Sequence, residues 1–164
     1  MERKTKVHAE DGKQEIVITR AFDLPLELLF KAYEDPEIFA QWMGTKVLKL
    51  ENKKHGSYAF ETSDPQGNVV FRANGTIAEF IPNKKITRTF EMEKTPASAF
   101  RYPVQLEFLE FAKLTDHTSK LTMQIVYKSV EARDQILKLP FAQGINWAHN
   151  RLQEIVNKLG NNVS

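Results

Sequence analysis

The most conspicuous absence from this sequence is cysteine, which does not occur among its 164 residues. The chain therefore has no disulfide, thiolate zinc site, iron–sulfur cluster or cysteine nucleophile. Long apolar runs are missing too. The N-terminal stretch MERKTKVHAEDGKQE is polar and charged, and no later segment approaches the roughly 18 uncharged apolar residues of a membrane span. We expect no signal peptide, no membrane span and a cytoplasmic location.

An excess of either charge is also absent, with 23 Lys and Arg against 21 Asp and Glu. The basic residues are scattered along the chain, so no nucleic-acid partner is predicted. Catalytic motifs are scarce: there is no glycine-rich phosphate loop, no Gly-x-Ser-x-Gly turn and no His-Glu-x-x-His helix. The four histidines lack the spacing of a metal site. We expect no metal, no cofactor and no set of catalytic residues.

Aromatic residues are what the chain has instead: 11 Phe, 4 Tyr and 2 Trp. Large aromatic side chains can fill a core or line an apolar cavity. At this length a single domain over 1–164 is sufficient to bury such a core. Within it, we expect 1–13 to be a polar N-terminal segment able to add a hairpin strand, and 160–164 to be a flexible tail.

Strand-like segments with turn chemistry between them make up most of the chain. The first two flank Asp11-Gly12, a pair typical of hairpin turns because glycine accepts a positive φ. Gly75, inside one long segment, indicates a bulge that bends the sheet. The predicted strands are 5–9, 14–22, 45–51, 57–62, 69–81, 85–93, 102–114 and 120–130. Together they favour a curved antiparallel sheet.

Two short helices are predicted between the second and third strands. Asp23 is placed to cap a helix over 25–33, with apolar residues along one face. Asp35-Pro36 repeats the signal, a cap followed by proline at the first helical position. This second helix is expected to end at Gly44.

The clearest periodic signal lies near the C-terminus. A helical pattern follows Val130 and is interrupted at Pro140. Beyond it, apolar residues recur at spacings of three and four as far as Leu159. A helix over 140–159 is about 30 Å long, enough to cross the concave face of a twisted sheet.

Several local motifs stand at consistent intervals along this order of elements. They are Ile18-Thr19-Arg20-Ala21-Phe22-Asp23-Leu24-Pro25 before Leu29-Phe30-Lys31-Ala32, Asp35-Pro36-Glu37 before Trp42, Gly75-Thr76-Ile77-Ala78-Glu79-Phe80-Ile81-Pro82, Val130-Glu131-Ala132-Arg133-Asp134, and Gly144. In this order they resemble the START-like, or birch-pollen-allergen-like (SRPBCC), superfamily, and within it the homologues of the activator of heat-shock protein 90 ATPase. The chain departs from the family at His55-Gly56-Ser57, where a glycine pair is common, and at Pro140, where proline is rare.

The resemblance implies an α+β helix-grip fold, a curved antiparallel sheet wrapped around a long C-terminal helix with two short helices after the first long strand. It also implies a cavity between sheet and helix that takes lipid-like or polyketide-like molecules. Strand alternation and helix spacing give the candidate lining residues. These are Trp42, Tyr58, Phe60, Phe71, Arg88, Phe90, Phe108, Met123, Ile145 and His149. For each apolar residue among them, plain core packing is the competing interpretation.

Two polar candidates stand out from this apolar set. Arg88 alternates with apolar neighbours on a face expected to be buried. It either holds an anionic group of a ligand, or pairs with Glu79 or Glu110, or marks a bulge that reverses the phase. His149 lies at the edge of the helical stripe, where we expect a half-exposed imidazole that could otherwise hydrogen-bond a ligand or move a proton.

Three functions remain open at this stage. The first is a protein that binds a small apolar ligand. The second is an interaction module that modulates a chaperone ATPase, as the family name suggests, although the eukaryotic members use an additional N-terminal domain for which 1–13 is too short. The third is an enzyme of the cyclase or aromatase kind, with Glu79, Glu110 or His149 as acid or base. Exposed sheet edges also leave room for a homodimer.

Overall fold

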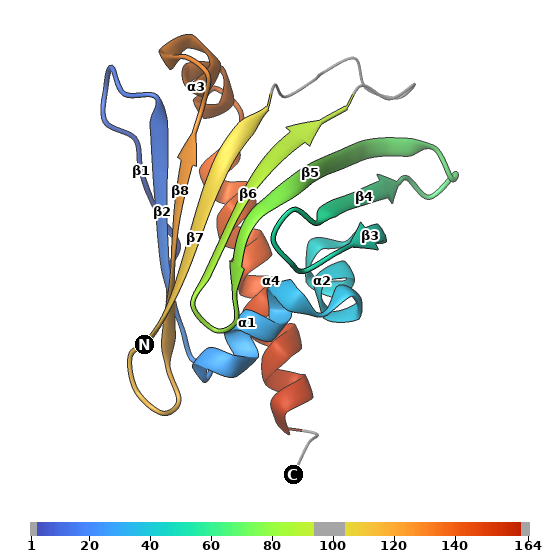
Figure 1. The fold of residues 1–164 in the computed structure, drawn as a ribbon, viewed down its shortest axis with the longest axis vertical. Helices are drawn as coiled ribbons and strands as arrows, with labels where there is room; N and C mark the ends of the chain where they lie inside the picture. The colour runs from blue at the N-terminus through green and yellow to red at the C-terminus, as the bar shows by residue number, and fades with distance from the viewer. Residues whose placement is uncertain (1–2, 94–103, 162–164) are drawn as a thin grey trace.

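The computed structural model describes residues 3–93 and 104–161. The elements follow one another in a simple order (Figure 1). They are β1 (Lys6–His8), β2 (Glu15–Phe22), α1 (Leu26–Glu34), α2 (Pro36–Met43), β3 (Lys46–Leu50), β4 (Ser57–Ser63), β5 (Val69–Ile81), β6 (Lys85–Met92), β7 (Gln105–Lys113), β8 (Ser119–Val126), α3 (Val130–Leu137) and α4 (Phe141–Asn161).

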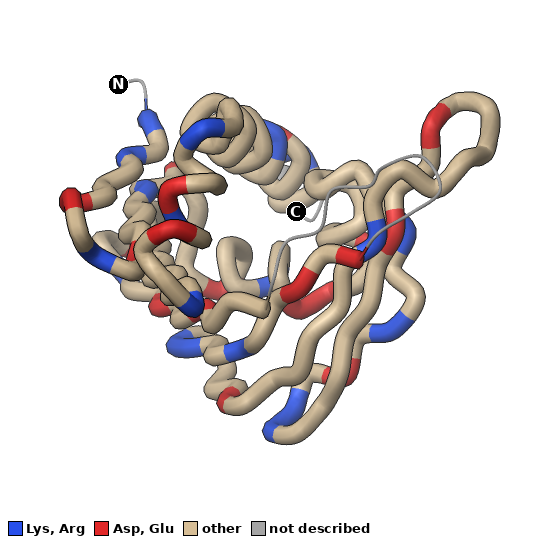
Figure 2. Tube along the Cα trace, turned by 90° about the horizontal axis from the view of Figure 1, so that it is seen from above, with Lys and Arg blue, Asp and Glu red and all other residues tan. Residues whose placement is uncertain are grey.

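Within the described residues, eight strands form one antiparallel sheet in the order β1-β2-β8-β7-β6-β5-β4-β3. The pairing of β2 with β8 joins the beginning of the chain to its last strand, so β1 and β3 are left as the edges. The sheet curves, and α4 crosses its concave side with α1 and α2 beside it (Figures 1 and 2). The predicted helix-grip fold is confirmed.

The N-terminal hairpin follows from residue alternation and turn chemistry. Residues of β2 alternate between buried and half-buried positions, with Ile16, Ile18 and Phe22 fully buried. Gly12, in the predicted turn, has a φ of 78° that an L side chain rarely adopts. Because β1 pairs with β2 in register Val7 to Ile18, the polar N-terminal segment does add a strand.

The two short helices begin differently. At α2, the Asp35 carboxylate accepts hydrogen bonds from the backbone N–H groups of Glu37 and Ile38, and Gly44 ends the helix with a φ of 64°. At α1 the prediction was wrong, because Pro25 occupies the capping position and no side chain caps the helix. Asp23 instead accepts a hydrogen bond from Arg3 at 3.3 Å.

The end of the chain contains more helix than the sequence indicated. Strand β8 stops at Val126, short of the predicted Val130, because Ser129 caps α3 by accepting a hydrogen bond from Ala132 N–H. Pro140 stands just before α4, where its missing N–H is harmless. Gly160 lies within α4, so the predicted tail over 160–164 was wrong at its start; 162–164 lie outside the described residues.

The core fills the space between the concave face of the sheet and the helices. Its buried apolar residues come from every layer, and α4 contributes Leu152 and Val156. Both lie in the C-terminal half of α4, which passes beside α1. The N-terminal half of α4 is different, because it borders the cavity described below.

Sheet curvature is produced by local irregularities. The register of β5 against β6 shifts between Ile77 and Glu79, close to but not at Gly75, where the bulge was predicted. Gly75 has another role: a Cβ there would lie 2.0 Å from the Thr89 carbonyl oxygen and 2.6 Å from the Tyr58 ring. At the departure from the family pattern, His55 adopts a φ of 69°, a conformation that favours glycine.

Candidate functional site

A cavity of about 190 Å³ lies between the N-terminal half of α4 and the concave face of the sheet. Its walls combine aromatic and aliphatic side chains with a few polar groups. The lining residues are Tyr33, Phe39, Trp42, Met43, Phe60, Arg88, Phe90, Gln105, Glu107, Met123, Ile125, Tyr127, Ile136, Phe141, Ile145 and His149. Contributions from α1, α2, α3, α4 and four strands make this the place where the layers of the fold meet.

One wall of the cavity is a continuous cluster of aromatic rings. The Phe60 ring lies 5.4 Å from that of Phe39, 6.4 Å from that of Phe90 and 5.8 Å from that of Phe71, between ring centroids. Phe39 in turn makes an edge contact with Trp42 at 5.4 Å. Rings in such contacts hold one another in place, so this wall is rigid as well as apolar.

Hydrogen bonds fix the helices around that wall. Trp42 Nε1 donates to the Ala32 carbonyl at 2.8 Å, joining α2 to α1. From α4, Arg151 Nη2 donates to the Gln41 carbonyl at 2.9 Å, near the C-terminal end of α2. A cation at this position also interacts favourably with the helix dipole. The spacing between α4 and α2, and with it the width of the cavity, is therefore set by specific contacts.

The first polar group of the cavity is a buried ion pair. Arg88 Nε donates to Glu107 Oε1 at 2.9 Å, and Gln105 Nε2 donates to Glu107 Oε2 at 2.9 Å. The side chains of Arg88 and Glu107 are only 13% and 6% exposed. Arg88 also lies over the Tyr58 ring, 5.2 Å from its centroid. Both oxygens of Glu107 are thus occupied by protein donors.

Two tyrosines flank this ion pair. Burial raises the pKa of Tyr33 and of Tyr58 well above the ordinary tyrosine value, and it outweighs the opposing effect of the Arg88 charge. Both phenols are therefore protonated at physiological pH. The Tyr58 hydroxyl donates a hydrogen bond to the Thr89 carbonyl at 2.6 Å. The Tyr58 ring lies against Gly75, where the absence of a Cβ leaves room for it.

The second polar group is His149, whose side chain is 0% exposed. Its Nδ1 lies 2.7 Å from Thr5 Oγ1, and its ring makes an edge contact with Phe22 at 5.5 Å. Nε2, at the other side of the ring, is buried and has no hydrogen-bond partner among the residues that the structure describes. Burial, and secondarily the charge of Arg20, lower the pKa of His149 to about 3, so the imidazole is neutral.

A polar network behind His149 connects the two ends of the chain. Arg20 Nη1 donates to Thr5 Oγ1 at 3.3 Å and to Asn146 Oδ1 at 3.2 Å, and its Nη2 donates to Asn150 Oδ1 at 2.9 Å. Thr5 N–H donates to Asn146 Oδ1 at 3.0 Å. Strands β1 and β2 thereby hold α4, and His149 with it, against the sheet.

Comparison with protein families matches residues 23–157 to the model described as "Activator of Hsp90 ATPase homolog 1-like protein". This range includes both short helices, the sheet from β3 to β8 and most of α4. The chain belongs to this family. No protein of curated function matches it.

Solved structures of bacterial proteins share the fold of this family member. Protein Ms6760 from Mycobacterium smegmatis superposes with a TM-score of 0.79 at 18% identity, covering 94% of this chain and 98% of that one. A protein from Arthrobacter aurescens gives 0.81 at 14% identity, with 93% and 91% covered. A protein from Rhodobacter sphaeroides gives 0.79 at 18% identity, with 95% and 99% covered. At these identities the likeness shows the fold alone.

The structure brings seven of the ten predicted site residues of this family member together around the cavity. They are Trp42, Phe60, Arg88, Phe90, Met123, Ile145 and His149. Tyr58 and Phe71 lie one layer outside, stacked on Phe60 at 6.2 and 5.8 Å. Trp147, which lies off the helical stripe, is 61% exposed and contacts Arg151 instead.

The placement of Phe108 on the concave face was wrong. In β7 the buried positions are Gln105, Glu107, Leu109 and Phe111, so the intervening Phe108 points to the other face of the sheet. Apolar residues occur on both faces of this strand, so the alternation of residue types alone did not show which face is buried. The cross-strand pairing decides the phase, because Arg88 stands directly opposite Glu107.

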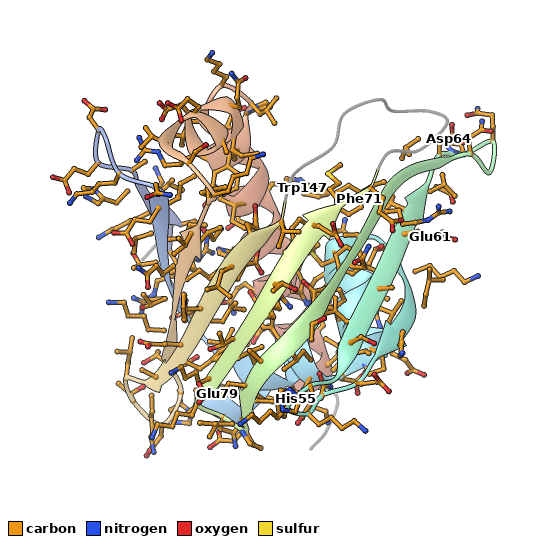
Figure 3. All side chains as sticks on the ribbon, turned by 45° about the horizontal axis from the view of Figure 1, so that its top comes forward. His55, Glu61, Asp64, Phe71, Glu79 and Trp147 are labelled. Atoms are coloured by element: carbon orange, nitrogen blue, oxygen red, sulfur yellow. The ribbon has the colours of Figure 1, made fainter. Side chains whose placement is uncertain are left out.

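Other polar expectations are corrected in the same way. Arg88 pairs with Glu107 rather than with Glu79 or Glu110. Glu79 lies at the far end of β5 from the Asp64 turn and pairs with Lys85 at 3.0 Å, away from the cavity (Figure 3). Glu110 is exposed, whereas His149 is fully buried and not half-exposed.

The sequence analysis missed Gln105, Glu107, Arg20 and Thr5. A signal existed for Arg20, because it continues the buried alternation of Ile16, Ile18 and Phe22 as Arg88 does in its own strand. None existed for Thr5, since its contacts with α4 span more than 140 positions.

Two further features concern what the site and the chain contain. In 3–93 and 104–161, no three His, Asp or Glu side chains gather in a way that could hold a metal ion. Across the same residues, no helix combines the length and apolar character needed to cross a membrane.

Proposed function

We propose that this protein binds a small, largely apolar molecule in the cavity between α4 and the sheet. The observation that carries the proposal is the cavity itself, about 190 Å³ of space walled by aromatic and aliphatic side chains and containing two buried polar sites. Binding pockets for small molecules have this composition, an apolar lining with few polar groups that orient the ligand. Membership of a family built on a ligand-binding scaffold supports the same conclusion.

Native mass spectrometry of the purified protein, with extraction and identification of any molecule that accompanies it, tests this proposal. Ile145→Phe fills part of the cavity, and we expect it to displace the bound molecule. Ile155→Phe is the matched control, because Ile155 is also half-buried on α4 but does not line the cavity. Retention of the same ligand by both variants, or no binding of any apolar compound by the wild type, overturns the proposal.

A second candidate is an enzyme of the cyclase or aromatase kind. It is favoured by one observation, that Glu107 and His149 both line the cavity. Such an enzyme needs a polar pair at the substrate, and a single acid or base can assist enolisation or dehydration. This function is established if the protein converts a bound compound, and if His149→Phe still binds that compound but no longer converts it. If the compound is unchanged after prolonged incubation, the function is excluded for that compound.

The family description also raises the chaperone-modulating function for this chain. Its test is direct: the ATPase rate of heat-shock protein 90 is measured with and without the protein. A stimulated rate would transfer the proposal to a protein partner, and an unchanged rate would leave the small-molecule function as the proposal.

A further inference from the structure

The chemical class of the ligand is indicated by His149, which lines the cavity, an inference that rests on the proposed function. Thr5 Oγ1 lies against Nδ1, and Thr5 is not a lining residue. Nε2 is on the opposite side of the ring, fully buried and without a partner in the described part of the chain. A buried polar atom of this kind is destabilising unless something completes its hydrogen bond.

The neighbours of Nδ1 determine where the imidazole proton lies. A guanidinium only donates, so the contact from Arg20 Nη1 makes Thr5 Oγ1 an acceptor there. The hydroxyl has one proton of its own, and among its described contacts His149 Nδ1 is the only group that can accept it. An arrangement in which Thr5 Oγ1 donates to Nδ1 uses both the hydroxyl proton and the nitrogen lone pair, whereas the other tautomer leaves the hydroxyl proton without a described acceptor. This favours the neutral tautomer with its proton on Nε2, where the Nε2–H group has no acceptor among the described residues.

The dimensions of the cavity limit the size of its ligand. An apolar protein cavity of about 150 Å³ is sufficient to bind benzene. The cavity here, at about 190 Å³, has space for one ring with a short substituent. Rings of Phe39, Phe60 and Phe90 surround it and can make edge contacts with such a ligand. A long acyl chain or a fused-ring polyketide exceeds this volume.

We propose that the cavity binds a single-ring aromatic compound with an acceptor oxygen of the carbonyl type on its substituent, and that this oxygen accepts a hydrogen bond from His149 Nε2–H. The aromatic wall supplies the apolar contacts. Thr5 and Arg20 act as positioning residues, because they hold the proton of His149 on the nitrogen that faces the ligand.

A pair of probes of equal shape tests the hydrogen bond. Acetophenone and α-methylstyrene have the same skeleton and differ by C=O against C=CH2. Their Kd values are measured by ligand-observed NMR titration of the wild type and of His149→Phe. Comparison of the ratio of the two Kd values between the wild type and His149→Phe cancels the difference in solvation of the probes. We expect the preference for acetophenone to fall about tenfold in His149→Phe. His149→Gln, which keeps a donor, is expected to retain part of it.

A second measurement does not depend on a variant that folds. The long-range ¹H–¹⁵N spectrum of the free wild-type protein distinguishes the two tautomers, and we expect the proton of His149 on Nε2, with a shift of that nitrogen when acetophenone is added. A proton on Nδ1 overturns the proposal, as does an equal Kd ratio in the wild type and His149→Phe.

The failures of the two proposals are separable. If neither probe binds but native mass spectrometry finds a larger apolar ligand that Ile145→Phe displaces, the aromatic class is wrong and the binding function stands. If neither the probes nor any accompanying molecule binds, both proposals fail.

Discussion

Replacement of Arg88 by methionine is the most informative perturbation of the cavity. Methionine keeps much of the length of the side chain and removes the charge, so Glu107 is left as a carboxylate that is 6% exposed and held by Gln105 alone. Breaking a buried ion pair by removing one partner typically destabilises a protein by about 3–5 kcal/mol. For a domain of this size, that loss corresponds to a decrease in Tm of roughly 6–20 °C.

The double-mutant cycle separates the ion pair from general damage. Glu107→Gln leaves the Arg88 charge without its partner, whereas the double variant Arg88→Met/Glu107→Gln contains no unpaired buried charge. We expect the double variant to lose less stability than the two single variants added together, by about 1–3 kcal/mol. Urea denaturation at pH 7, followed by circular dichroism, gives the free energies of unfolding of the wild type and the three variants.

A surface ion pair provides the control. Lys158 lies 3.3 Å from Glu154 on the exposed side of α4, and both side chains are more than 60% exposed. We expect Lys158→Met to leave the denaturation midpoint nearly unchanged. Two results would contradict a stabilising ion pair between Arg88 and Glu107. One is a loss of stability in Arg88→Met as small as that in Lys158→Met, and the other is a double variant whose loss equals the sum of the two single losses.

Three other properties can be tested independently. Because burial lowers the pKa of His149 to about 3, protonation favours the unfolded state; its stabilisation is complete above the ordinary value of 6.5 and is lost as the pH falls towards 3. Urea denaturation at stepped pH should show a steeper slope in this window for the wild type than for His149→Phe, with a difference of at most about 1.4 kcal/mol per pH unit. Gly75→Ala places a Cβ against the Thr89 carbonyl and should lower stability by about 1–3 kcal/mol, whereas Gly144→Ala, in open space on α4, should raise it by about 0.5–1 kcal/mol; an equal effect of both in thermal unfolding contradicts the close approach. Asp35→Ala removes the cap of α2 and should lower stability by about 0.5–2 kcal/mol, with Asp35→Asn as the conservative control.

The fold was accessible from the sequence because its signals are local. The Asp11-Gly12 turn, the Asp35-Pro36 start of α2 and the apolar stripe of α4 are each decided by residues within a few positions of one another. Asp23 shows the limit of such signals. It has the right chemistry for a cap, but the capping position lies two residues later, at Pro25, and the carboxylate binds Arg3 instead.

The candidate site was accessible only in part because its polar groups depend on pairing between strands. Arg88 could be identified from the sequence because it is a charged residue among apolar residues of one strand face. Its partner Glu107 depends on the register of β6 against β7, which cannot be read from a local sequence pattern. A one-residue change of phase moves every side chain of a strand to the other face, and this is what misplaced Phe108. The burial of His149 likewise depends on Thr5, from the other end of the chain.

The bond between Thr5 and His149 also has a consequence for biosynthesis. Thr5 is translated 144 positions before His149. Until α4 has left the ribosome, Thr5 and Arg20 have no helix to hold, and the cavity lacks one wall. Contacts between such distant positions form late because closing a long loop is entropically unfavourable. On the proposed function, a nascent chain halted before α4 therefore lacks the wall of the cavity that a ligand needs.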